Sequence, residues 1–386
     1  MTEAYIVDAV RTAGGRRKGG FAGVHPVDLG AAALNALLDR TGVDPASVDD
    51  VIIGCVTQGG EQSFAFGRSI ALASRLPQSV PAVTIDRQCG SSQQAIHFAA
   101  QAVMSGTQDL VIAGGCESMT RVPLNSNWRL HLEAGVGEGP WSNALLIKYG
   151  VAEFSQFHGA QAMADKYGFS REDMDAYALS SHKRAAVAIQ AGAFKQEIVP
   201  VQTAAGVVDQ DEGVRFETSL EAIGAVKPIT EGGTITAANA SQIADGASCL
   251  LVANAEALKT HRLTPIARIH NLTVMGGDPV IMLEAPIPAT RRALQRAGMT
   301  LEDIDLFEVN EAFASVPLAW LKELGADPAK VNVNGGAIAL GHPLGATGTK
   351  LMATLVHTLR ARGKRWGLQT MCEGGGIANV TIVEAL

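Results

Sequence analysis

The stretch CGSSQQAIHFAAQAVMSGTQDLVIA, residues 89–113, decides the fold class of this chain. From Gly90 to Gln108 it contains no Asp, Glu, Lys or Arg, and its apolar residues recur at helical spacing on more than one face. This pattern predicts a buried helix, and the apolar run that follows Gly106 predicts a strand. A helix joined to a strand with so little charge is typical of layered α/β architecture.

The same unit occurs again near the end of the chain. The loop around His342 leads into a predicted helix, Gly363 and a predicted strand over residues 367–371. A second correspondence covers a helix, a turn glycine and a strand in each half: residues 29–38, Gly42 and 51–53 against residues 288–294, Gly298 and 306–307. We infer an internal duplication of one αβ unit, and we expect function where the two halves meet.

The composition limits the class of protein. The 386 residues exceed one ordinary core and indicate two or three domains. With 47% hydrophobic but only 5% aromatic residues, and with 42 glycines, the core is expected to consist of closely packed Ala, Val, Ile and Leu. A net charge of −7 argues against nucleic acid as a partner, because phosphate binding needs a basic surface. An anionic ligand must then meet a local basic patch.

The N-terminus and the cysteines indicate the compartment. The first ten residues predict a strand and carry Glu3 and Asp8, so they lack the basic and apolar regions of a signal peptide. No apolar run approaches membrane-spanning length, so we expect a cytoplasmic protein that does not bind a membrane. The five cysteines contain no Cys-x-x-Cys pair and no histidine lies at a metal-ligand spacing. Reduced thiols and no metal are therefore expected.

Residues 118–238 differ in composition from the rest of the chain. Charged residues, aromatic residues and helical stretches replace the apolar strands. We interpret this part as a large insertion that covers the substrate site. Its basic residues could bind an anionic ligand, although each one alone is more simply explained as a solvated surface charge. They are Arg121, Arg129, Lys148, Lys183, Arg184 and Lys227.

Cys89 stands at the predicted start of the buried helix, next to Gly90 and Ser91. Unpaired N–H groups and the helix dipole favour a thiolate at such a position, which would make Cys89 a nucleophile at neutral pH. Most cysteines in apolar sequence are inert packing residues. The position at a helix start favours the reactive interpretation here.

Three further segments place side chains that could take part in catalysis on or beside turns, most of them rich in glycine. Of nine histidines only His342 has this setting, and in contact with Cys89 it could take the thiol proton and then stabilise negative charge on a thioester oxygen. Cys372 precedes three glycines, where a thiol could act as general acid and base, although an incidental cysteine in such a turn is equally consistent. Asn310 could orient water or donate to an oxyanion, and Glu311 could brace its neighbours.

Together these segments resemble the thiolase family. Its Cys-x-Ser, Asn-Glu-Ala-Phe, Gly-His-Pro and Cys-x-Gly signatures stand here at residues 89–91, 310–313, 341–343 and 372–374, and the likeness extends along essentially the whole chain. The resemblance implies a five-layer αβαβα fold of the α/β class, made of two duplicated halves with an inserted loop domain over the substrate site. The implied division is 1–118 plus 239–262 for the N-terminal half, 119–238 for the loop domain and 263–386 for the C-terminal half.

The resemblance also implies an activity. Thiolases transfer acyl groups between coenzyme A and acetyl-CoA, by cleaving 3-oxoacyl-CoA or by the reverse Claisen condensation. Cys89 would accept the acyl group, His342 would activate it, and Cys372 would act on the acetyl carbon as acid and base. Asn310, through a water, and His342 would form one oxyanion hole, and the amides of Cys89 and Gly374 the other. Coenzyme A is a substrate, no cofactor is implied, and a homodimer or homotetramer is expected.

Contacts with the substrate follow from the same resemblance. Ser241 matches the family serine beside the pantetheine, Met282 lies in a segment similar to one lining the acyl pocket, and Lys227 is a further candidate for coenzyme A. His158 aligns with a position where family members that handle acetoacetyl chains have methionine, so the pocket should differ from that of a short-chain biosynthetic thiolase. The chain resembles actinobacterial degradative thiolases, which leaves linear and bulky 3-oxoacyl thioesters open.

Two other classes share part of this pattern. A ketoacyl synthase-type condensing enzyme has the duplicated fold and a helix-start cysteine, but it places a histidine or asparagine where this chain has Cys372. A non-catalytic acyl-CoA-binding protein could keep the fold, although it would not need all four signatures intact. Chain length, ring preference and physiological direction stay open, because pocket volume depends on residues 118–238.

Overall fold

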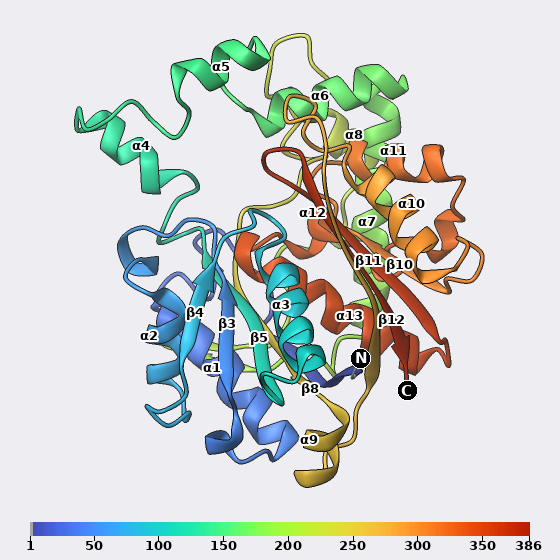
Figure 1. Cartoon of the computed structure of the whole chain (residues 1–386). Coiled ribbons are helices and arrows are strands. Elements are labelled where there is room, and N and C mark those ends of the chain that lie inside the picture. Colours follow the sequence, from blue (N-terminus) through green and yellow to red (C-terminus); the bar gives the residue numbers. More distant parts are fainter. Residues whose placement is uncertain (1–2) are drawn as a thin grey trace.

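The structure is a computed structural model that describes residues 3–386, and its strands form two similar sets (Figure 1). The N-terminal set runs in the order β4 (Ala82–Ile85), β3 (Asp50–Gly54), β5 (Leu110–Ser118), β8 (Ala244–Ala253) and β1 (Ala4–Arg11), with the short β2 (Gly15–Arg16) beside β8. The C-terminal set runs in the order β10 (Leu306–Val309), β11 (Trp366–Glu373), β12 (Ile377–Ala385) and β9 (Ala267–Gly276).

The two sets repeat one pattern of strand pairing. β3 pairs parallel with β5, β5 antiparallel with β8, and β8 antiparallel with β1. In the C-terminal set, β10, β11, β12 and β9 show the same succession of one parallel and two antiparallel pairs. β1 and β9 also pair, with Tyr5 opposite Arg268, so the two sets join edge to edge. The duplication predicted from the sequence is therefore confirmed.

Helices cover both faces of the strand sets and produce five layers (Figure 1). The outer layers are α1 (Pro26–Thr41) and α2 (Phe66–Ala73) on one side, and α10 (Pro286–Ala297) and α11 (Ser315–Leu324) on the other. α3 (Ser91–Ser105) and α13 (Thr347–Ala361) lie side by side between the sets. On β3, Val51 and Ile53 join the outer core while Ile52 joins the central core. Burial on both faces explains the continuous apolar runs of these strands.

The two central helices touch at their first turns. A Cβ atom at Gly348 would lie 2.1 Å from the backbone nitrogen of Gln93, so the start of α13 rests directly on the backbone of α3. The loops that precede these helices carry Cys89 and His342. Close contact between the helix starts therefore brings together two residues that are remote in the sequence.

The insertion between β5 and β8 is mainly helical. Its elements are α4 (Ser126–Glu133), α5 (Asn143–Tyr149), α6 (Gln156–Tyr167), α7 (Arg171–Gln190), the hairpin β6 (Val201–Thr203) and β7 (Gly206–Val208), and α8 (Leu220–Gly224). α4 and α5 extend away from the sheets (Figure 1), whereas α6 packs on α11 and α7 packs on α12 (Ala337–Leu340). The helical stretches predicted within residues 118–238 are thereby confirmed.

The remaining elements are short. They are α9 (Ala255–Thr260) and four single turns, η1 (Pro45–Ser47), η2 (Gly60–Gln62), η3 (Pro328–Lys330) and η4 (Leu344–Ala346). Within residues 3–386, no helix combines the length and the apolar character that crossing a bilayer requires.

Candidate active site

A tight turn presents Cys89. Gln88 has a φ of 50°, a left-handed conformation that is unusual for a residue with a side chain. The Ser91 hydroxyl accepts a hydrogen bond from the Arg87 amide at 2.9 Å and donates to the Gln88 carbonyl at 2.6 Å, which closes the turn. Gly90 is the N-cap of α3, so Cys89 precedes the helix by two residues. Strain of this kind is found at functional sites.

The protonation state of Cys89 differs from the sequence prediction. Burial raises the pKa of the Cys89 thiol to about 12, and Glu373 adds to the rise. The prediction that the helix start makes this residue a thiolate is therefore wrong, because the loss of solvation outweighs the helix dipole. The resting sulfur is a neutral thiol, so it needs a base during attack.

His342 is suited to be that base. Its Nδ1 lies 2.6 Å from Oγ1 of Thr347, and the Thr347 hydroxyl donates to the Pro343 carbonyl at 2.8 Å. Since that hydroxyl has only one proton, it accepts from Nδ1–H, which assigns the lone pair to Nε2. Burial lowers the pKa of His342 to about 3, and the charge of Lys350 contributes, so the imidazole is neutral.

Asn310 lies beside this free nitrogen. Its Nδ2 is 3.5 Å from Nε2 of His342, and its backbone amide donates to the Thr370 carbonyl at 3.1 Å. Its side-chain oxygen Oδ1 is buried and has no hydrogen-bond partner among the described residues. A buried amide oxygen is normally satisfied by the fold, so this one fits a side chain that serves a bound molecule.

Glu311 braces the same loop, as the sequence predicted. Its carboxylate accepts hydrogen bonds from the Ser181 hydroxyl at 2.6 Å and the Tyr177 hydroxyl at 3.0 Å, both on α7. It also accepts from the Asn332 side chain and the Ile338 amide, each at 3.1 Å. These four donors tie the Asn310 loop to the insertion and to α12.

Cys372 lies at the end of β11 and is fully buried. Burial raises its pKa well above the ordinary value, and the Cys89 sulfur is close enough to raise it further. A Cβ atom at Gly374 would lie 2.8 Å from Oε1 of Gln88, so the glycine turn after Cys372 touches the residue before Cys89. The two thiols therefore share one site, and both are held in the protonated form.

The residues predicted to contact the substrate lie partly around this site. The Ser241 amide donates to the Ala312 carbonyl at 2.9 Å, which places Ser241 beside the Asn310 loop. Met282 is buried and has a φ of 57°. The residue before it, Ile281, contacts Gly159 at the start of α6. His158, next to Gly159, is exposed.

The basic residues predicted in the insertion lie in different settings. Lys227 is exposed beyond α8, and no hydrogen bond of the described residues ties it to the catalytic group. Arg121 pairs with Glu61 at 2.5 Å, and Arg184 donates to the Val331 carbonyl at 2.6 Å.

Four supporting residues were missed by the sequence analysis. Glu117, at the end of β5, accepts from the amides of Val56, Thr57 and Gly345 at 2.8 to 2.9 Å and so joins the loop after β3 to the His342 loop. A carboxylate ending an otherwise apolar strand was the available signal. The other three are Thr347, Lys350 and Glu373. Within residues 3–386, no cluster of His, Cys, Asp and Glu could hold a metal ion.

The fold and the site together define the class of protein. Two copies of one αβ unit bring two thiols, a neutral imidazole and an amide to a glycine-rich turn, an arrangement suited to acyl transfer through sulfur. The family model "Thiolase, N-terminal domain" matches residues 4–256, and "Thiolase, C-terminal domain" matches residues 263–385. The chain belongs to the thiolase family, as its signatures predicted, and is an acyltransferase.

Individual relatives agree with this assignment. The steroid 3-ketoacyl-CoA thiolase FadA6 of Mycobacterium tuberculosis is 56% identical over 387 residues, which cover 100% of this chain and 95% of that protein. The 3-ketoacyl-CoA thiolase of Bacillus subtilis is 43% identical over the full length of both chains. Among solved structures, the Bacillus anthracis acetyl-CoA acetyltransferase superposes with a TM-score of 0.91 at 36% identity, and human mitochondrial 3-ketoacyl-CoA thiolase with 0.89 at 37%, each covering 100% of this chain and 99% of its own. The predicted thiolase-like fold is thereby confirmed.

Proposed function

We propose that this thiolase cleaves 3-oxoacyl-CoA, and runs the reverse Claisen condensation, through an acyl group carried on Cys89. Relatives named 3-ketoacyl-CoA thiolases support the substrate class. The assignment of roles rests on one observation: Cys89 shares a buried cluster with Leu344, two residues after His342, and its sulfur lies close enough to Cys372 to raise the pKa of that thiol. Cys372 also argues against a ketoacyl synthase, which has no need of a second thiol.

In the first step the Cys89 sulfur bonds to the 3-oxo carbon while its proton passes to Nε2 of His342. The amides of Cys89 and Gly374 stabilise the charge that develops on the 3-oxo oxygen. The lone pair assigned to Nε2 supports this direction of proton transfer. A thiol with a pKa of about 12 also requires that attack and deprotonation be coupled.

In the second step the bond between C2 and C3 breaks, and its electron pair forms the enolate of acetyl-CoA. The enolate oxygen meets protonated His342 and a water oriented by Asn310. Cys372 gives its proton to the enolate carbon, and acetyl-CoA leaves. Coenzyme A then gives its thiol proton to the Cys372 thiolate and attacks the acyl group, and the Cys89 sulfur leaves and recovers its proton from His342.

A bulky, ring-bearing acyl group is the proposed substrate. The 56% identity to a protein named as a steroid thiolase supports it, as does His158 at the position where short-chain enzymes have methionine. Linear 3-oxoacyl-CoA is the second candidate, supported by the Bacillus subtilis relative. A panel of 3-oxoacyl-CoA thioesters of rising bulk, compared by kcat/KM, separates the two: the highest value for a linear chain would refute the ring preference.

The proposal includes contacts and assembly. Ser241, Lys227, His158 and Met282 are the proposed residues for coenzyme A and the acyl chain. A cytoplasmic homodimer or homotetramer is proposed, and the open edge strand β4 supports it, because exposed Phe64 and Val83 lie on or near this edge. Light scattering on the purified protein would test the assembly.

Acetyl transfer to the protein tests the central claim. Incubation with labelled acetyl-CoA should add one acetyl mass to the intact wild-type chain and none to Cys89→Ala. Cys249→Ala is the matched control, because Cys249 is also buried but lies on β8, in the outer core. Acetylated Cys89→Ala, or an unlabelled but folded wild type, would refute the assignment.

A further inference from the structure

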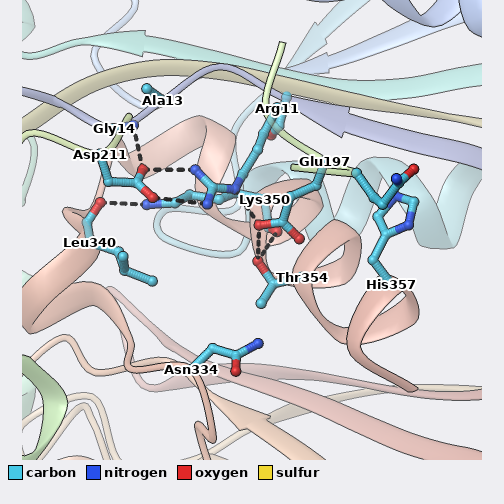
Figure 2. Close-up of polar contacts among 12 residues, drawn as sticks. Arg11, Ala13, Gly14, Glu197, Asp211, Asn334, Leu340, Lys350, Thr354 and His357 are labelled. Atoms are coloured by element: carbon cyan, nitrogen blue, oxygen red, sulfur yellow. Dashed lines mark hydrogen bonds and ion pairs between the residues drawn. The ribbon is translucent and has the colours of Figure 1, made fainter. Parts of the chain in front are cut away.

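A cluster of four buried charges lies outside the reacting groups (Figure 2). Arg11 of β1, Glu197 and Asp211 of the insertion, and Lys350 of α13 are each at most 4% exposed. Arg11 Nε donates to Glu197 at 2.6 Å, and its two terminal nitrogens donate to Asp211 at 2.7 and 2.9 Å. Thr354 of α13 donates to Glu197 at 2.9 Å. The cluster joins the first strand, the insertion and the second central helix.

Arg11, Asp211 and Lys350 keep their charges although they are buried. Burial alone would lower the pKa of Arg11, but Asp211 and Glu197 raise it. Burial alone would raise the pKa of Asp211, but Arg11 and Lys350 lower it. Burial lowers the pKa of Lys350 to about 8, and the charge of Arg11 lowers it as well. The carboxyl groups of Asp211, Glu197 and Glu308 raise this pKa and so limit the decrease. Lys350 is therefore mostly charged at neutral pH.

Lys350 donates its hydrogen bonds to the backbone that leads into His342. Its Nζ donates to the Leu340 carbonyl at 2.6 Å and to the Gly341 carbonyl at 2.9 Å. Gly341 has a φ of 80°, so the chain turns sharply between α12 and the imidazole. Figure 2 shows the Lys350 side chain reaching the Leu340 carbonyl. The Leu340 oxygen is also confined by Gly14, where a Cβ atom would lie 2.4 Å from it.

Hydrogen bonds thus hold both the backbone before His342 and the His342 ring itself. Lys350 fixes the two residues before His342, and Thr347 fixes Nδ1 of the ring. The same positive charge adds to burial in keeping the ring neutral. Charged donors make stronger hydrogen bonds than neutral ones, which suits a loop that must hold a base in place.

We propose that Lys350 is a positioning residue for catalysis: by binding the Leu340 and Gly341 carbonyls it holds His342 where the ring can accept the proton of Cys89. The inference deepens the proposed function and rests on it, because His342 is the base proposed there. Arg11, Asp211 and Glu197 act indirectly, since they stabilise the charge of Lys350 in the interior.

Variants at position 350 test the proposal. Lys350→Met removes both the donors and the charge, Lys350→Gln keeps amide donors without the charge, and Lys350→Arg keeps both. Lys330→Met is the matched control, because Lys330 donates to the Ile304 carbonyl at 2.8 Å in the same way, on the segment before β10. Steady-state thiolysis from pH 3 to 9, a range that includes the pKa of His342 of about 3, and thermal unfolding are measured for each full-length protein.

Lys350→Met should lower kcat by about 10²-fold with little change in KM for coenzyme A, since a displacement near 1 Å costs about that much. The acidic limb of its kcat profile should move to higher pH, because loss of a positive charge raises the pKa of His342. Lys350→Gln should show the same shift with a smaller loss of kcat, and it carries the test if Lys350→Met does not fold. Lys350→Arg should restore most of kcat, and Lys330→Met should lose stability only.

Two results would overturn the inference. One is a folded Lys350→Gln protein with the wild-type kcat and acidic limb. The other is a loss of kcat in Lys330→Met as large as in the position 350 variants. Neither would affect the proposed function, which fails instead if His342→Ala or Cys89→Ala retains acyl transfer.

Discussion

Gly348→Ala should disable the enzyme by adding one methyl group between the central helices. The new Cβ would lie 2.1 Å from the Gln93 nitrogen and 2.7 Å from its Cα, whereas ordinary contact begins near 3.4 Å. The first turns of α3 and α13 must therefore separate by about 1.3 Å. Gly348 does not have a positive φ, so the backbone itself accepts alanine and only the neighbouring helix opposes it.

The magnitude follows from which residues these helices carry. Cys89 precedes α3 and His342 precedes α13, so the separation acts directly on the distance between nucleophile and base. A misplacement of this size lowers kcat by about 10²-fold. Overpacking should also cost about 1 to 3 kcal/mol of stability, which leaves a protein of this size folded.

The assay is steady-state thiolysis beside urea unfolding, with Gly224→Ala as the control. Gly224 ends α8 on the surface, and a Cβ atom there would meet nothing within 4 Å, so its kcat and stability should match the wild type. A Gly348→Ala enzyme with wild-type kcat would refute the claim that contact between the helix starts sets the catalytic geometry.

Three further changes have defined outcomes. Glu117→Ala should lower the free energy of unfolding in urea by at least about 3 kcal/mol, because three buried amides lose their hydrogen-bond acceptor and each loss costs about 1 to 3 kcal/mol. A decrease of less than about 1 kcal/mol would contradict this. His97→Gln should remove part of the acid sensitivity: the pKa of His97 is about 3 when folded and 6.5 ordinarily, so the unfolded chain binds the proton first as pH falls. Between pH 7 and pH 5 the free energy of unfolding of the wild type should fall by about 2 kcal/mol more than that of this variant. Equal decreases would contradict a buried neutral ring at His97. Glu373→Gln should make Cys89 react faster with iodoacetamide at neutral pH, because Glu373 is one of the causes that raise the pKa of the Cys89 thiol; equal alkylation rates in the variant and the wild type would contradict this.

Much of the fold could be predicted because its signals are local. The apolar, charge-free helix after Cys89, the glycine that ends it and the strand that follows repeat around His342, and the strand pairing repeats with them. Residue type and a glycine-rich setting likewise pointed to Cys89, His342, Asn310 and Cys372. These signals depend only on spacing within some 20 residues.

The sequence could not predict how protons are distributed in the site. The helix start suggested a thiolate at Cys89, but its pKa is set by burial and by Glu373, nearly 300 residues later in the chain. The supporting roles of Glu117 and Lys350 were also invisible, since each depends on backbone groups brought close only by packing. By itself, then, the sequence determined the repeated αβ unit and the identity of the reacting side chains. The tertiary structure alone decided their charge states and mutual placement, because desolvation and hydrogen bonding depend on which distant segments surround a group.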